Sequence, residues 1–502
     1  MAITLIGKVM GILRDRMQGV YFGTYTAEGI AFAQASLLPR AFLDIMFASV
    51  LSASFIPVFN KYFETKGKEA AFKLAASFIK VVLLVTVVVT VLAMIFAGPI
   101  YSFFWGWESD LGIRLLRMMF PIMVITGLAF SFTGILQSLG QFYIPAAMSV
   151  ASNGIILLYY FFFIDHFGVY GLVAAFLIGW SMQVLIQVPF IIKTVGLRFI
   201  LKASTKGLSE IGRLSLPVMV ASWLGPVNFL VNTRASANLY GGEHGIVAIN
   251  MAYTLYTVIT GLFVLSLANV LFPALSKLAA IEDWIGYTGS LRSSMRALLF
   301  LLLPLSFGIM ALSEPLVSLV FQGGRFQETS VNITATAKFF FSFGIVGFGL
   351  QVILSRACFA LQDGRGPLIT SLLAIAVNFI LSFALAPILE IGGPALASAI
   401  AINLAAFGLF VRLYKRLPQV LWPVDMTLDA VKMLILAIIM YGFVIFIAEL
   451  FMGNRILAVV IPAGTGVIVY MIGALVWRVP EAKIGFSWIL MKAKEEVRKK
   501  PD

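Results

Sequence analysis

The sequence predicts an all-α polytopic membrane protein with about fourteen transmembrane helices, and three observations support this class. Hydrophobic residues make up 61% of the 502 positions and charged residues only 12%, whereas a soluble domain carries about 25% charged residues. Apolar stretches long enough to cross a bilayer recur along the whole chain. Lys and Arg gather on alternate connections between these stretches, as expected for cytoplasmic loops.

A membrane-spanning helix needs about 20 apolar residues. We expect spans at residues 3–22, 29–59, 73–100, 111–140, 144–164, 169–192, 212–240, 246–276, 295–320, 331–361, 367–388, 393–413, 427–450 and 456–477. The first stretch lacks a small-residue cleavage site, so we expect a span there rather than a signal peptide.

The charges of the connections predict the orientation. The connections 101–110 and 165–168 are acidic or aromatic, whereas the alternate ones are basic, as in Lys61, Lys66 and Lys68. Both termini are therefore expected in the cytoplasm. The same rule explains the net charge of +13, so we expect no nucleic-acid partner.

The chain repeats itself in the same order. Residues 55–61, "FIPVFNK", recur as 271–277, "LFPALSK", an offset of 216. "LQSLGQFYIP" is echoed by "FALQDGRGP" with an offset of 222, and "GVYGLVAAF" by "GGPALASAI" with an offset of 224. These offsets predict two parallel six-helix lobes around a central cavity, as in transporters that rock about a site between their halves.

The predicted organisation has five parts. They are an N-terminal lobe at 1–192, an amphipathic cytoplasmic linker at 193–211, a C-terminal lobe at 212–413, two additional helices within 414–478 and a basic cytoplasmic tail at 479–502.

Signatures of catalysis are scarce. The sequence has no G-x-x-x-x-G-K-[ST] phosphate loop and no H-E-x-x-H motif. One cysteine and two histidines provide neither a disulfide framework nor the usual zinc spacings. We expect a transporter rather than an enzyme, without a cofactor, driven by the membrane potential, an ion gradient or consumption of its product.

Charged residues inside the apolar stretches are the candidate site. Such charges usually face a bundle interior or a water-filled cavity. The first span carries Lys8, Arg14, Asp15 and Arg16, the second Arg40 and Asp44, and the seventh Arg234. A cationic cavity suits an anionic substrate, since arginine can grip a phosphate through two hydrogen bonds.

Several of these charges have a plainer interpretation. Arg14 and Arg16 could snorkel to the outer interface, because the span ends near Tyr21. Arg40 and Asp44 lie four residues apart and could neutralise each other. Polar residues such as Asn153 are more often interhelical hydrogen-bonding groups than ligands.

"GKVMGILRDRMQGVYFG", "SFIPVFNKY" and residues 320–371 together resemble the lipid II flippases of bacterial peptidoglycan synthesis, the MurJ/MviN family. "GKVMGILRDRMQGVYFG" resembles the family's opening, with its basic residue, its R-D pair and a following F-G. "SFIPVFNKY" resembles A-F-[VI]-P-[VI]-F. Residues 320–371 resemble L-F-x-x-G-x-F followed by L-x-R-x-F-Y-A-L-x-D-x-x-[TG]-P. The similarity runs along nearly the whole chain and implies the fold of the multidrug, oligosaccharidyl-lipid and polysaccharide exporter superfamily.

Some of the family's charged positions are matched by charged residues of this sequence, and others are not. The R-D pair falls on Arg14 and Asp15 and the upstream basic residue on Lys8. The family's acidic residue of the second span falls on Ile30, with Glu28 two positions away. Other family positions fall on uncharged residues, namely Leu43, Ala48, Thr254, Asn232 and Ser382.

These observations predict a flippase of lipid II, a polyprenyl-diphosphate-linked sugar-peptide, in the bacterial cytoplasmic membrane, where membrane lipids and the cell-wall synthesis machinery are the expected partners. Lys8, Arg14, Arg40 and Arg234 would bind the substrate, with Asp15, Asp44 and Glu28 as gates or counter-charges. The alternatives are a flippase for another polyprenyl-linked glycan, a drug exporter of the same superfamily, an enzyme acting on lipid-linked sugars, and a scaffold.

Overall fold

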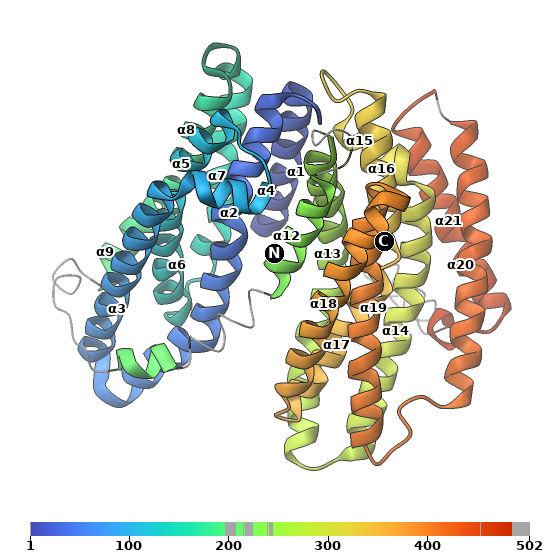
Figure 1. Ribbon diagram of the computed structural model, residues 1–502. Coiled ribbons are helices and arrows are strands. Elements are labelled where there is room, and N and C mark those ends of the chain that lie inside the picture. Colours follow the sequence, from blue (N-terminus) through green and yellow to red (C-terminus); the bar gives the residue numbers. More distant parts are fainter. Residues whose placement is uncertain are drawn as a thin grey trace, which may run out of the picture. The chain divides into compact units, whose positions relative to one another are not determined.

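The computed structural model describes residues 2–195, 207–213, 215, 224–237, 239, 244–451 and 453–483. These residues are almost entirely helical, and the β-type pairing among them is one isolated bridge between Gly323 and Phe326 (Figure 1). The chain groups into two compact units. Unit 1 comprises residues 1–247 and 323–330, and unit 2 comprises residues 248–322 and 331–502.

Unit 1 is built from a first set of helices that runs in chain order. They are α1 (Ala2–Phe22), α2 (Ala27–Val50), the π-helical turn η1 (Leu51–Phe55), α3 (Ile56–Ile95), α4 (Ala97–Trp105), α5 (Asp110–Met119), α6 (Ile122–Ser138), α7 (Tyr143–Phe162), α8 (Ile164–Leu185), α9 (Val188–Val195) and α12 (Leu224–Ser236).

The remaining helices are α13 (His244–Ala280), α14 (Trp284–Ala311), α15 (Ser313–Phe321), α16 (Glu328–Ser342), α17 (Ile345–Ala360), α18 (Arg365–Leu389), α19 (Gly392–Arg416), α20 (Val424–Leu450) and α21 (Leu457–Val476). Within unit 2, α20 packs on both α14 and α21 (Figure 1). α20 and α21, which fall in the predicted pair of additional helices, therefore share the core of unit 2.

Nine of the described helices are long and apolar enough to span a membrane, or ten if the pair α16 and α17, bent by 44°, forms one broken span. The all-α polytopic membrane class is thereby confirmed. The predicted total of fourteen includes segments that this criterion leaves out. Among them is α1, because every stretch of 18 residues in it contains Lys8, Arg14, Asp15 and Arg16.

Local chemistry explains where α1 ends and α2 begins. Gly23 adopts a φ of 62°, which glycine tolerates without steric cost. The hydroxyl of Thr26 accepts a hydrogen bond from the backbone N–H of Gly29 at 3.2 Å, which caps the N-terminus of α2. Glu28 lies in the first turn of α2, where its negative charge complements the helix dipole.

The helix bounds confirm the internal repeat. α4 and α15 correspond at both ends with an offset of 216, and α3 and α14 end with that same offset. The start of α7 and that of α18, Tyr143 and Arg365, are 222 positions apart. The offset increases from 216 to 222 between these two pairs of helices. The extra residues lie in the connection after α15 and at the start of α16, which together are longer than the connection from α4 to α5.

Backbone details repeat as well. The amide of Gln141 donates to the Leu136 carbonyl at 2.8 Å, and that of Asp363 donates to the Cys358 carbonyl at the same distance. The residues before them, Gly140 and Gln362, both have positive φ, at 78° and 58°. The segments that follow α6 and α17 therefore correspond residue by residue, with an offset of 222.

The same offset corrects the third predicted match. Gly168 has φ 51° and ψ −144°, and Glu390, 222 positions later, has φ 49° and ψ −131°. The equivalence in backbone geometry is therefore 222, two fewer than the 224 given by the sequence match of Gly168 with Gly392.

The predicted boundaries of the five parts remain predictions. Most of the linker 193–211 and residues 484–502 of the tail lie outside the described residues. By its contacts α12 groups with unit 1, although its residues belong to the predicted second lobe.

Candidate functional site

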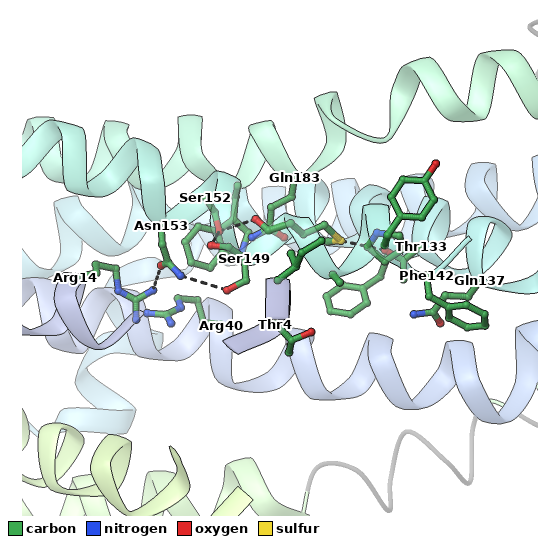
Figure 2. Close-up of a pocket in the computed structure, with 17 residues that line it drawn as sticks. Thr4, Arg14, Arg40, Thr133, Gln137, Phe142, Ser149, Ser152, Asn153 and Gln183 are labelled. Atoms are coloured by element: carbon green, nitrogen blue, oxygen red, sulfur yellow. Dashed lines mark hydrogen bonds between the residues drawn. The ribbon is translucent and has the colours of Figure 1, made fainter. Parts of the chain in front are cut away.

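A pocket of about 820 Å³ lies within unit 1, with walls from α1, α2, α6, α7 and α8. Its lining combines two arginines with hydroxyl, amide and aromatic side chains (Figure 2). Among the described residues that line it, Arg14 and Arg40 carry the charge, and none is a carboxylate. This volume is in the usual range for a small-ligand site.

Arg14 is held in place on two sides. Its Nε and Nη2 donate to Oδ1 of Asp15 at 3.0 and 2.7 Å, and its Nη1 donates to Oδ1 of Asn153 at 3.0 Å. The side chains of Arg14 and Asp15 are 12% and 15% exposed, so this ion pair is largely shielded from solvent. The structure thus brings together the adjacent pair that the sequence singled out.

Asn153 joins α7 to α1. Its Nδ2 donates to the Gly7 carbonyl at 3.2 Å and to Oγ of Ser149 at 3.3 Å, while its Oδ1 accepts from Arg14. A Cβ at position 7 would lie 2.8 Å from Oγ of Ser149, so Gly7 permits the close approach of the two helices. The interhelical role expected for Asn153 is present, together with a role in orienting Arg14.

An aromatic pair on α8 supports both arginines. Cζ of Arg14 and Cζ of Arg40 each lie 5.7 Å from the ring centroid of Phe176. Cζ of Arg40 also lies 5.2 Å from Trp180, and the two rings stack at 5.4 Å. Cation–π contacts of this kind contribute about 0.5–2 kcal/mol each. Only their spacing of four residues along one helix face could have pointed to Phe176 and Trp180 before the structure was known.

The other predicted site residues lie elsewhere. Lys8 is half-buried on α1 and Glu28 is exposed on α2, and neither is among the described residues that line the pocket. Arg234 lies in the last turn of α12 with its guanidinium packed against Gly106, and it too is absent from that lining. The side chain of Asp44 lies outside the described residues.

Among the described residues of unit 2, the positions equivalent to Arg40 and Trp180 carry different side chains. With the offset of 216, the counterpart of Arg40 is Tyr256, which stacks on Tyr253 at 6.0 Å and contacts Phe341 at 5.7 Å. With the offset of 222, the counterpart of Trp180 is Ile402. At these two described positions the repeat conserves neither the guanidinium nor the indole ring that the pocket of unit 1 contains.

Two further ionic clusters in unit 2 are structural. Asp363, before α18, accepts from Arg412 and from the amide of Gly366 at 3.1 Å. The Arg412 hydrogen bond holds the pKa of this carboxyl below its usual value. Arg296 on α14 donates to Asp429 on α20 at 2.6 Å and to Glu481, in the segment after α21, at 2.8 Å. These bonds tie α20 and that segment to α14.

Two sequence motifs meet at the end of α1. The amide of Arg325, in the connection from α15 to α16, donates to the Val20 carbonyl at 2.8 Å. The hydroxyls of Thr24 and Ser330, both buried, lie 2.8 Å apart. The F-G turn after α1 and the G-G-R-F connection, about 300 residues apart, are therefore parts of one contact inside unit 1.

No group of three or more His, Cys, Asp and Glu side chains suited to a metal ion occurs in the part of the chain that the structure describes. Two of the positions at which the family resemblance falls on uncharged residues are buried, namely Asn232 on α12 and Ser382 on α18. Oγ of Ser382 donates to Oδ1 of Asn378 at 3.3 Å.

Comparisons with known proteins agree with this architecture. The family model described as "Lipid II flippase MurJ" matches residues 20–464. The chain is 27% identical to a probable lipid II flippase MurJ of Treponema pallidum over 80% of this chain and 77% of the relative. It is 25% identical to the lipid II flippase MurJ of Burkholderia cenocepacia over 82% of both chains.

Solved structures show the same fold. A lipid II flippase MurJ in an inward closed conformation matches with a TM-score of 0.78 and 21% identity over 95% of this chain and 98% of that one. A multidrug resistance MATE transporter in an inward-facing conformation matches with a TM-score of 0.71 and 15% identity over 82% and 94%. The match of the family model to most of its length, in a multi-pass helical membrane protein, places this chain in the lipid II flippase MurJ family.

Proposed function

We propose that this protein moves lipid II from the inner to the outer leaflet of the bacterial cytoplasmic membrane. The observation that carries the proposal is the pocket of unit 1, where Arg14 and Arg40 present two guanidiniums over the ring of Phe176. A diphosphate is a suitable partner, because guanidiniums bind phosphate oxygens through paired, charge-assisted hydrogen bonds. The family to which the chain belongs supports the choice of lipid II.

The pocket contains features that help an anion to bind. Low exposure strengthens the attraction between an arginine and a phosphate, because less water screens it. Asp15 accepts two hydrogen bonds from Arg14 and so provides a counter-charge that a phosphate can replace. Asn153 and Phe176 keep the guanidinium in position, which lowers the entropic cost of binding.

The transport step would be alternating access. The cationic pocket takes up the diphosphate and part of the headgroup from the cytoplasmic leaflet, and the polyprenyl chain stays in lipid. A rearrangement of the lobes then exposes the headgroup outside. The membrane potential, an ion gradient or consumption of lipid II outside would supply the energy, with both termini in the cytoplasm. The cell-wall synthesis machinery would be the partner that consumes the product.

Multidrug export, one of the predicted alternatives, gains no support from this pocket. Exporters of cationic drugs need negative charge in the cavity, whereas the charged lining residues among those described are arginines. The likeness to MATE transporters, at 15% identity, concerns the fold.

Complementation tests the proposal. In a strain depleted of its own lipid II flippase, the wild-type chain should restore growth, and Arg14→Ala should fail at the same expression level. An inserted wild-type chain that does not restore growth would overturn lipid II as the substrate. Full rescue by Arg14→Ala would overturn the assignment of the pocket.

A further inference from the structure

The pocket of unit 1 is extended, and its two ends differ in chemistry. Figure 2 shows Arg14, Arg40 and Asn153 at one end and Thr133, Gln137 and Phe142 at the other. Gln183, Ser149 and Ser152 lie between them. From Asn153 to Phe142 the pocket follows eleven residues of α7, or about 16 Å at the rise of an α-helix. A diphosphate held by the two arginines leaves most of this length open.

Two side-chain amides face this remaining length without an internal partner. Gln137 on α6 and Gln183 on α8 line the pocket, both half-buried, and among the described residues neither amide group makes a hydrogen bond. Gln187, in the short connection between α8 and α9, contrasts with them. Its Nε2 donates to the Ala129 and Gln183 carbonyls, and its Oε1 accepts from Thr133.

The repeat shows that the fold does not require these amides. With the offset of 222, the counterpart of Gln137 is Phe359 and that of Gln183 is Ala405, both apolar. The same helices pack in unit 2 without polar groups at these places. A donor and an acceptor at each position of unit 1 are therefore available for a ligand.

Exposed rings complete this end of the pocket. Phe142 and Tyr143, at the N-terminus of α7, line the pocket and are 63% and 58% exposed. An aromatic face offers an apolar surface of the size of a sugar ring, and the phenol of Tyr143 adds a hydrogen-bonding group. Aromatic faces beside amide groups suit the alternating apolar faces and polar edges of a pyranose.

We propose that the segment of the pocket formed by Gln137, Gln183, Phe142 and Tyr143 binds the sugar joined to the diphosphate, so that the pocket recognises a polyprenyl-diphosphate-linked glycan rather than a diphosphate alone. Gln137 and Gln183 hydrogen-bond the hydroxyl and acetamide groups of the sugar, and the rings cover its apolar face. This inference rests on the proposed function. It adds that the headgroup extends from the two arginines toward Gln137 and Phe142.

Binding to two ligands tests the inference. The purified protein in detergent is titrated with lipid II and, separately, with undecaprenyl diphosphate, which lacks the sugars. Gln137→Met combined with Gln183→Met should weaken binding of lipid II about 5- to 30-fold, as expected for two lost hydrogen bonds, and leave binding of undecaprenyl diphosphate within about twofold. Arg14→Gln should weaken binding of both ligands.

Gln18→Met is the matched control, because Gln18 lies on α1 in the same unit and is absent from the described lining of the pocket. It should bind both ligands as the wild type does. Equal affinity of the wild type for both ligands, or an equal loss for both in the double variant, would overturn the sugar-binding segment and leave the proposed function standing. A wild type that binds neither ligand would overturn the proposed function and this inference together.

Discussion

At the scale of single residues, some contacts of Arg14 could be predicted from the sequence and others could not. The pairing with Asp15 could be predicted, because the two are adjacent in an apolar helix where charge is costly without a partner. The contact with Asn153 could not, since the two residues are 139 positions apart and only tertiary packing joins them. The ring of Phe176, shared between Arg14 and Arg40, is likewise a product of tertiary packing.

This geometry predicts the effect of removing Asn153. Asn153→Leu keeps a similar volume but loses the acceptor for Nη1 of Arg14 and the donor to the Gly7 carbonyl. We expect affinity for undecaprenyl diphosphate to fall about 5- to 10-fold, as for one oriented hydrogen bond to a charged group. Titration of the purified variant measures this effect. Ser181→Ala is the control, because the Ser181 hydroxyl donates to the Leu177 carbonyl of its own helix and Ser181 is absent from the described lining of the pocket. An unchanged affinity in Asn153→Leu would contradict the positioning role.

At the scale of the elements, the helices themselves were predictable and their long-range contacts were not. The F-G turn and the G-G-R-F connection were visible as motifs, but the sequence contains no signal that they meet. Gly23 and Gly324, with φ of 62° and 52°, allow the backbones to approach, and the hydrogen bond from Arg325 to Val20 closes the contact.

This contact can be tested by a disulfide. Thr24→Cys with Ser330→Cys, in a chain whose native cysteine is removed by Cys358→Ala, should form an intramolecular disulfide on mild oxidation, because the two hydroxyls lie 2.8 Å apart. Mass spectrometry of the digested protein would detect the linked peptides. Thr24→Cys with Thr334→Cys, one helical turn further along α16, should not cross-link. Absence of the disulfide from the first pair would show that the two segments do not meet.

The ion pair between Asp363, in the connection before α18, and Arg412 should make the stability of the protein depend on pH. Arg412 lowers the pKa of Asp363, so the ionised carboxylate stabilises the fold above its unfolded pKa of about 4. That contribution should disappear as the pH falls through the lower, folded pKa. Asp363→Asn, which loses the charge-assisted bonds, should lower the unfolding free energy by about 1–3 kcal/mol at pH 7 and flatten its acid dependence. Thermal unfolding of both proteins between pH 7 and pH 3 measures this, and parallel curves would contradict the assignment.

At the scale of the whole molecule, the internal repeat was the prediction that described most of the architecture. Composition and loop charge gave the class, and three short matches gave two parallel halves, which the helix ends and backbone angles confirm. The sequence could not show that the halves differ in function. Arg40 and Tyr256 occupy equivalent positions, yet one faces a polar pocket and the other packs in an aromatic cluster.

The number of spans shows that counting membrane helices by hydropathy alone can miss a helix that carries charges. Fourteen spans follow from apolar stretches and loop charges, whereas nine or ten described helices pass a strict test of length and charge. α1 falls outside because it carries four charged residues, and two of them, Arg14 and Asp15, form the ion pair at the pocket. The feature that excludes α1 from a simple count of spans is thus the one that gives the pocket its charge.

The most direct test of the central claim is the fraction of lipid II that becomes accessible from outside in cells depleted of their own flippase. Wild type should restore that fraction, whereas Arg14→Gln and Arg40→Gln, each removing one guanidinium from the ring of Phe176, should reduce it at least about tenfold. Arg365→Gln, at the exposed start of α18, should match the wild type. Wild-type levels of accessible lipid II in both pocket variants would contradict the account.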